Sequence, residues 1–101
     1  PFPHEQWTQH SKVQGCQSEA HVHVELQDGK VLLLSGADAK LVQGLMGILT
    51  LAINGSAPAQ ALLLSPDFVE EMGVLNSLSP SRSNGFRNMF DKVMAEIRNF
   101  V

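Results

Sequence analysis

Apolar and polar residues alternate strictly in the segment that follows the only cysteine of the chain. The apolar positions are Ala20, Val22, Val24 and Leu26, and the polar positions are Glu19, His21, His23 and Glu25. This period of two predicts a half-buried strand with its polar face toward solvent. Asp28-Gly29 then predicts a tight hairpin turn, because glycine accepts positive φ. Residues 30–34 are the expected partner strand.

A strongly apolar segment, residues 39–54, predicts the central helix of the core. Asp38 is the expected N-cap, and Gly55 the expected glycine just after the helix. Apolar side chains surround most of this helix, a pattern that is typical of burial on all sides. Gly44 and Gly47 are expected to let another backbone approach it closely.

Three further helices are predicted from one device, a serine N-cap with a proline in the first turn. The pairs are Ser56 with Pro58, Ser65 with Pro66, and Ser79 with Pro80. The last helix has an apolar stripe at spacings of three and four, formed by Phe86, Met89, Phe90, Val93, Met94 and Ile97. Gly85 lies inside it at a cost of about 1 kcal/mol relative to alanine, which indicates close packing.

Residues 1–14 are expected to be mostly extended loop. A hairpin followed by helices predicts an α+β domain.

Size and charge narrow the function. A chain of 101 residues fits one domain, and 44% apolar with 17% charged residues is typical of a folded protein. A net charge of −3 with scattered basic residues argues against nucleic-acid binding. The longest apolar stretch falls short of the roughly 20 residues that span a bilayer. One cysteine excludes an internal disulfide, and alone it holds neither zinc nor an iron–sulfur cluster.

Cys16 is the candidate for chemistry. It lies in Gly15-Cys16-Gln17-Ser18, on a loop directly before the first strand, where a thiolate can be presented to a partner. The alternative is a small buried hydrophobic residue, although its polar neighbours disfavour that. His21 and His23 form a possible metal pair without an obvious third ligand. His21 is also a possible base for Cys16 in a cysteine hydrolase, which needs an orienting group and a substrate cleft as well.

Ser79-Pro80-Ser81-Arg82-Ser83-Asn84-Gly85 is the second unusual segment. Arg82 falls in the first turn of the predicted last helix, where its positive charge opposes the helix dipole. A residue placed against a local rule is a candidate for partner contact or for steering an anion such as a thiolate. The alternative is that Arg82 bonds the preceding loop or covers apolar surface with its stem.

The Cys16 motif, the central helix and the Arg82 segment, in this order and spacing, resemble the SufE family. The resemblance extends over nearly the whole chain, including Lys12-Val13-Gln14-Gly15-Cys16 and Asp38-Ala39-Lys40-Leu41. It implies a small antiparallel sheet packed by helices, a fold shared with cluster-scaffold proteins of the IscU type. It also implies that Cys16 accepts sulfur from a PLP-dependent, SufS-like cysteine desulfurase, stimulates that enzyme, and relays the sulfur toward a downstream iron–sulfur scaffold. Such a carrier must protect its sulfur, so the Cys16 loop is expected to pack against apolar surface and to open in the complex with its partner.

The resemblance also assigns supporting roles. Arg82 and Asp38 match positions of the family pattern, and Gln17, Ser18 and His21 are the further candidates for partner contact. The chain departs from the pattern at His21, where an aromatic residue is usual, and near Gly36, where an acidic one is common.

Residues 1–101 are expected to be one SufE-like domain without the family's N-terminal helix. No resident cofactor or metal is implied, and the chain is expected to act as a covalent carrier rather than as a stand-alone enzyme. The expected location is the cytoplasm in a bacterium, or a plastid or mitochondrion in a eukaryote. The alternative function is a non-catalytic adaptor that regulates a desulfurase or another enzyme without carrying sulfur.

Overall fold

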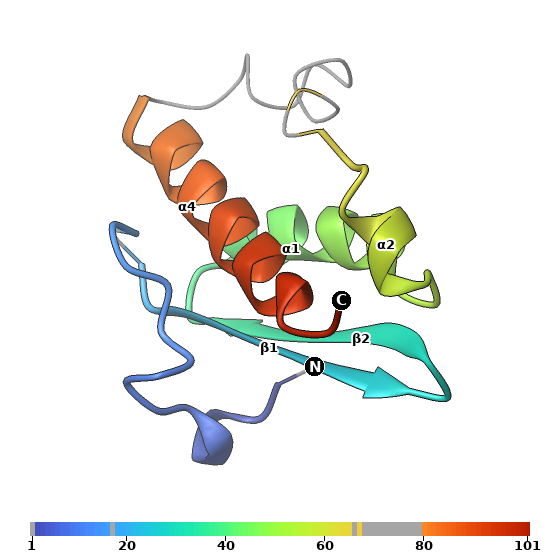
Figure 1. The fold of residues 1–101 in the computed structure, drawn as a ribbon. Helices are drawn as coiled ribbons and strands as arrows, with labels where there is room; N and C mark the ends of the chain where they lie inside the picture. The colour runs from blue at the N-terminus through green and yellow to red at the C-terminus, as the bar shows by residue number, and fades with distance from the viewer. Residues whose placement is uncertain (1, 17, 66, 68–79) are drawn as a thin grey trace.

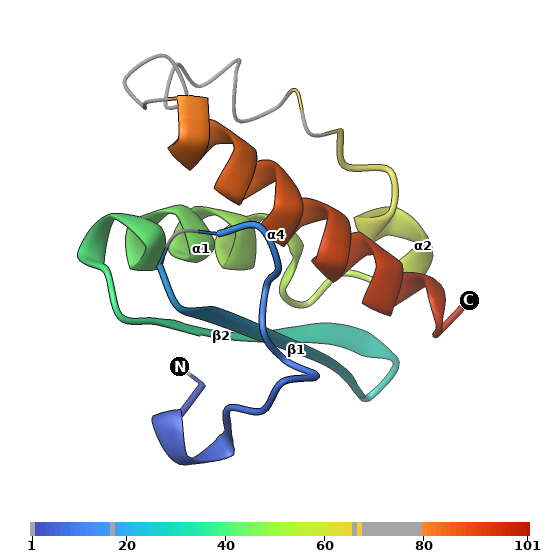
Figure 2. The same ribbon diagram turned by 90° about the vertical axis from the view of Figure 1, so that its left-hand side faces the viewer.

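The computed structural model describes residues 2–16, 18–65, 67 and 80–101, with Ser81 and Arg82 described through their backbone alone. Its elements in chain order are the 3-10 turn η1 (His4–Gln6), strands β1 (Ala20–Gln27) and β2 (Lys30–Ala37), and helices α1 (Lys40–Ile53), α2 (Pro58–Ala61) and α4 (Pro80–Arg98). The helices lie on one face of the hairpin and the N-terminal segment, residues 2–13, crosses the other (Figures 1 and 2). The predicted α+β fold, a small antiparallel sheet packed by helices, is confirmed.

The predicted hairpin is present. β1 and β2 pair antiparallel, in a register that runs from Ala20 opposite Ala37 to Gln27 opposite Lys30. Asp28 and Gly29 have φ angles of 55° and 74°, and two successive positive φ values are what a two-residue type I′ turn requires. β2 continues beyond the predicted end at residue 34, so the sheet is longer than the sequence pattern indicated.

The core lies between the hairpin and the helices. α1 covers β2, whereas α4 covers β1. The stripe predicted on the last helix is buried in full, and it consists of Phe86, Met89, Phe90, Val93, Met94 and Ile97. The apolar face of β1 packs against this stripe through Ala20, Val22 and Val24.

The prediction that α1 is buried on all sides is wrong for the described part of the chain. One side is buried, through Val42, Leu45, Met46, Leu49 and Ile53. Leu41 and Leu51 on the other side are 41% and 87% exposed. The reason is the two-layer architecture, in which only one side of α1 meets the sheet. The expected close approach at Gly44 and Gly47 is likewise absent from the described structure, since no residue outside their own stretch of helix comes within 4 Å of a Cβ at either position.

The predicted helix caps need correction. α1 begins at Lys40 with Ala39 as its N-cap and without a side-chain cap, so Asp38 is not the capping residue. β2 runs on to Ala37, so Asp38 directly follows the strand, and its N–H donates to the carbonyl of Glu19 over 3.1 Å. The expected glycine after α1 is confirmed at Gly55, which has φ 83°.

The other predicted caps are only partly described. α2 has Ala57 at its N-cap rather than Ser56, because the Ser56 carbonyl accepts the N–H of Val31 at the edge of β2. Ser65 accepts the N–H of Asp67 through its hydroxyl over 3.1 Å. Pro66 and Ser79 lie outside the described residues. None of the helices in the described ranges is long and apolar enough to cross a membrane.

The outer edge of β2 is covered by the turn after α1. Val31 donates to Ser56 over 2.8 Å and accepts from Gly55 over 3.0 Å. Between these bonds and the end of the strand, the Leu33 N–H donates to Oδ1 of Asn54 over 2.7 Å. A side chain here replaces a neighbouring strand, which protects an edge that otherwise pairs with other chains.

We therefore expect Asn54→Ala to lower the free energy of unfolding by about 1–3 kcal/mol, because it leaves the Leu33 N–H without its acceptor. Urea unfolding measures this loss. Asn54→Asp keeps the acceptor and should lose less, and Asn99→Ala near the exposed end of the chain should change stability by less than about 0.5 kcal/mol. Equal stability of Asn54→Ala and the parent chain would contradict this account of the edge.

Candidate functional site: the Cys16 loop

The base of the Cys16 loop, defined as residues 14–19, is fixed by backbone pairing. The Val13 N–H donates to the Ala20 carbonyl over 2.8 Å, and the Val22 N–H donates to the Ser11 carbonyl over 2.9 Å. The chain that leads to the cysteine therefore runs along the outer edge of β1, where the sequence predicted extended loop. Both ends of the loop are held by the sheet, and Cys16 lies near its tip.

The tip of the loop rests on α4. Gly15 has φ 76°, a conformation that glycine adopts without strain. The Asn88 side-chain amide donates to the Gly15 carbonyl over 3.3 Å, and it occupies the space that a Cβ on Gly15 would need. Gly85 is buried, and a Cβ built on it would lie 3.5 Å from Cys16 Sγ. Gly85 packs against Cys16, but a Cβ there would make only ordinary van der Waals contact, so the predicted need for a glycine at this position is not confirmed.

Cys16 is a free thiol of intermediate exposure. It packs against the edge of the apolar core, as expected for a loop that shelters its thiol. Cys16 is therefore not fully buried, as an inert core cysteine would be, and it is not fully exposed either. The sulfur is sheltered by α4 but lies close to the surface.

His21 lies on the other face of the sheet, and the prediction that it is solvated is wrong. Its exposed fraction is 2%, because the Trp7 ring stacks on it with centroids 4.5 Å apart. Nδ1 is 2.7 Å from Ser11 Oγ, and Nε2 is 2.9 Å from Glu19 Oε1. Both ring nitrogens are thus engaged away from Cys16. The N-terminal segment, folded back over the polar face of the sheet, causes this burial (Figure 2).

The sequence pattern did not predict this network. Trp7, Ser11 and Glu19 surround His21, and Trp7 also covers Gly36 so closely that a Cβ there would lie 2.9 Å from Nε1 of the indole. Gly36 is thus small because a ring lies over it. The one weak signal was a lone tryptophan in a polar segment. Among the described residues, no group of three or more His, Cys, Asp or Glu is arranged to hold a metal.

The hydrogen bond from His21 lowers the pKa of the Glu19 carboxyl below its ordinary value, with smaller help from the charge of Lys12. Glu19 is about half exposed, so solvent screens the interaction. The carboxylate forms part of the base of the Cys16 loop. Its contribution to stability is present above the ordinary pKa of a glutamate and is lost as pH falls through the lower folded-state value.

The other residues proposed from the sequence divide by position. Asp38 is exposed and lies beside Glu19, at the end of the sheet from which the Cys16 loop projects. Ser18 is half-buried within the loop. The backbone of Arg82 lies in α4, three residues before Gly85, and its side chain is not among the described ones. Gln17 lies outside the described residues altogether.

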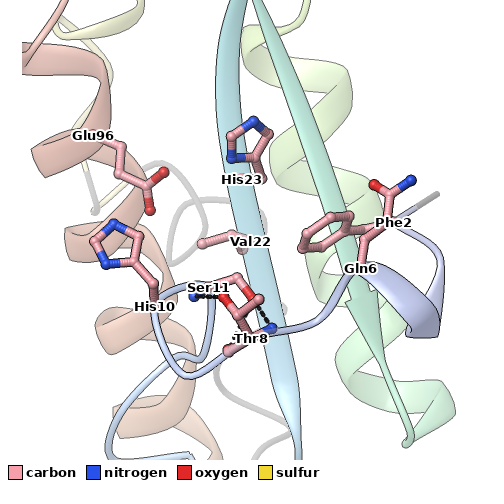
Figure 3. Close-up of a pocket in the computed structure, with 8 residues that line it drawn as sticks. All are labelled: Phe2, Gln6, Thr8, His10, Ser11, Val22, His23 and Glu96. Carbon is pink, nitrogen blue, oxygen red and sulfur yellow. Dashed lines mark hydrogen bonds between the residues drawn. The ribbon is translucent and has the colours of Figure 1, made fainter.

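A shallow cavity of about 220 Å³ opens beside the base of the loop rather than at Cys16 (Figure 3). Its walls come from the N-terminal segment, β1 and α4, and are formed by Phe2, Gln6, Thr8, His10, Ser11, Val22, His23 and Glu96. The Thr8 N–H donates to Ser11 Oγ over 2.9 Å, so the hydroxyl nearest to His21 is already bonded. The cavity walls therefore contain a local hydrogen-bond network, and Cys16 is not among the residues that line them.

The fold and site define a small α+β domain that holds one half-sheltered thiol on a loop fixed at its base. The sequence model of the SufE family, described as an Fe-S metabolism associated domain, matches residues 1–97. The chain belongs to the SufE family.

Three curated relatives agree. An uncharacterized SufE-like protein of Synechocystis sp. is 46% identical over 80 residues, covering 79% of this chain and 50% of that protein. The cysteine desulfuration protein SufE of Plasmodium vivax is 35% identical over 88 residues, covering 83% and 36%. SufE-like protein 1 of Arabidopsis thaliana, named chloroplastic/mitochondrial, is 35% identical over 83 residues, covering 81% and 22%.

A solved structure supports the fold. The solution structure of a hypothetical protein from Thermus thermophilus superposes with a TM-score of 0.85 at 25% sequence identity, covering 99% of this chain and 74% of that one. The chain spans half or less of the length of the three curated relatives. That residues 1–101 form a single domain lacking the family's N-terminal helix stays a prediction.

We expect the Glu19 carboxyl to titrate below the ordinary glutamate pKa of about 4.3 in NMR spectra of the chain. His21→Leu removes the hydrogen bond that favours the carboxylate, so the Glu19 pKa should rise toward that ordinary value. The stability that Glu19 contributes at neutral pH should then be smaller in His21→Leu than in the parent chain. An unchanged Glu19 pKa in His21→Leu would contradict the assignment.

Proposed function

We propose that this chain is a sulfur acceptor that takes persulfide sulfur from a PLP-dependent cysteine desulfurase onto Cys16 and relays it for iron–sulfur cluster assembly. The observation that carries the proposal is the single thiol, held near the surface on a loop that the sheet fixes at both ends. Family membership supports the same reading, and one relative is named for cysteine desulfuration.

The transfer step conserves electrons. The Cys16 thiolate attacks the outer sulfur of the desulfurase cysteine persulfide, a sulfur–sulfur bond forms at Cys16, and the bond to the desulfurase cysteine breaks. The desulfurase cysteine leaves as a thiolate. The outer sulfur, with its proton or negative charge, is then bound to Cys16. No outside oxidant or reductant is needed.

A sole cysteine suits a carrier. The chain has one cysteine, so no second thiol within it can attack a Cys16 persulfide and close an internal disulfide. The sulfur then leaves only to another molecule, which we propose is a downstream iron–sulfur scaffold. The half-buried position of Cys16 beside α4 limits attack by free thiols in solution.

The contact surface we propose for the desulfurase surrounds the loop. Ser18 and Asp38 lie at this end of the sheet, and the α4 backbone at Arg82 lies one turn before Gly85. Gln17 completes the proposed set from the sequence. His21 lies beneath the sheet with both ring nitrogens bonded, so a supporting role for it would act through the base of the loop.

The experiment that tests the function separates a carrier from an adaptor. We expect the chain to accelerate alanine release by a cysteine desulfurase supplied with cysteine, and Cys16→Ser to abolish that acceleration, because the substituted hydroxyl does not accept sulfur. An adaptor that acts by binding alone would stimulate equally well with serine at this position. The folded state of Cys16→Ser, checked by urea unfolding, is the control.

We expect Arg82→Ala to slow sulfur transfer several-fold while changing the free energy of unfolding by less than about 0.5 kcal/mol, because the role proposed for Arg82 is partner contact rather than packing. The physical reason is the loss of a positive charge that favours an approaching thiolate or persulfide. Arg98→Ala, at the other end of α4, is the matched control and should leave transfer unchanged. Parallel loss of stability and transfer in Arg82→Ala would show a structural role instead.

A further inference from the structure

One side of α4 carries a row of residues that contact the Cys16 loop and its flanks. Gly85 faces Cys16, and Asn88 donates to the Gly15 carbonyl over 3.3 Å. One turn farther along, Lys92 Nζ donates to the His10 carbonyl over 2.9 Å. The spacing of three and four places these side chains on one face of the helix.

The contacts of this row differ in what they hold. Lys92 holds the N-terminal segment ahead of the loop, where the backbone is also paired with β1. Asn88 holds the tip, and it does so at the residue directly before the cysteine. Within the described residues of the loop, residues 14–16, 18 and 19, the tip is therefore held by the Asn88 hydrogen bond, whereas the base is held by backbone pairing with β1.

We propose that Asn88 is a positioning residue that latches the Cys16 loop against α4 and thereby sets how often the thiol is exposed. Breaking its hydrogen bond to Gly15 lets the tip lift while the base stays paired with the sheet. In the closed position Cys16 Sγ lies beside Gly85, where even a Cβ would be 3.5 Å from the sulfur, so the sulfur packs against this part of the helix without a clash. A docking desulfurase then gains the thiol by displacing Asn88.

The consequence for sulfur transfer rests on the proposed function, whereas the latch itself does not. With a closed and an open tip in equilibrium, the reaction of the thiol with a small alkylating reagent reports the open fraction. A hydrogen bond of ordinary net strength changes that fraction by about twofold to tenfold. The single cysteine makes the signal unambiguous.

The experiment is the rate of Cys16 alkylation by iodoacetamide in the native chain. Asn88→Ala and Asn88→Leu should both react about twofold to tenfold faster than the parent, because neither donates to the Gly15 carbonyl. Leucine has the same branching as asparagine and at least its volume, so it separates the hydrogen bond from simple filling of space. In the urea-unfolded chain all variants should react at one rate, which shows that the thiol itself is unchanged.

Lys92→Gln is the matched control, since it weakens a neighbouring contact of the same row that holds the N-terminal segment ahead of the loop. It should leave the alkylation rate within about twofold of the parent. Three results would each overturn the latch: parental rates in Asn88→Ala, slow alkylation restored by Asn88→Leu, or equal acceleration by Lys92→Gln. If the latch holds but Cys16→Ser still stimulates a desulfurase, the proposed function fails and the inference about loop opening survives.

Discussion

The sheet formed by the described residues has two strands, and that constraint shapes the rest of the described structure. An isolated two-stranded sheet is marginal in water, so both its faces and both its edges need cover. α1 and α4 cover the apolar face, and the turn at Asn54 covers the edge of β2. The remaining edge and face are covered by residues 2–13. The chain before the cysteine is thus tied to β1 because the sheet needs a neighbour there, and this tie fixes the base of the Cys16 loop.

The loop inherits two different kinds of support. Backbone hydrogen bonds at Val13 and Val22 join the loop to the sheet. Both of these residues are buried, so solvent has little access to the bonds. At the tip, the described residues show an exposed side-chain bond to α4 and the packing of Cys16 against Gly85. Stability in proteins varies locally, and segments with few buried contacts open most easily. The proposed role as a sulfur carrier needs this combination, because the partner must find the loop at a fixed position and the tip must move to expose the thiol.

Much of the fold followed from local pattern. The alternation in β1, the Asp28-Gly29 turn and the stripe on α4 were each predicted, because period and turn chemistry act over a few residues. The burial of α1 was not, since its exposed Leu51 is as apolar as its buried Leu49. Which side of an apolar helix meets the sheet depends on the number of layers, which the sequence pattern does not encode. The N-cap at Asp38 failed because β2 extends to Ala37.

The candidate site was also predictable only in part: single residues stood out in the sequence, but their long-range contacts did not. Cys16 stood out by being alone, and Gly85 by its cost inside a helix. His21 was misjudged because its burial depends on Trp7, fourteen positions earlier, folding back across the strand. Asn88 was missed because an asparagine on a helix surface has no local signature for a bond to a loop 73 residues away. The contacts that hold the Cys16 loop in place are long-range, whereas the residues proposed to carry the chemistry can be recognised one at a time in the sequence.

The claim that Cys16 carries sulfur is tested most directly by the intact mass of the chain after incubation with a cysteine desulfurase, PLP and cysteine. The account predicts a gain of one sulfur atom that maps to Cys16, disappears on treatment with dithiothreitol and is absent from Cys16→Ser. No gain in mass, or a gain that persists in Cys16→Ser, would contradict it.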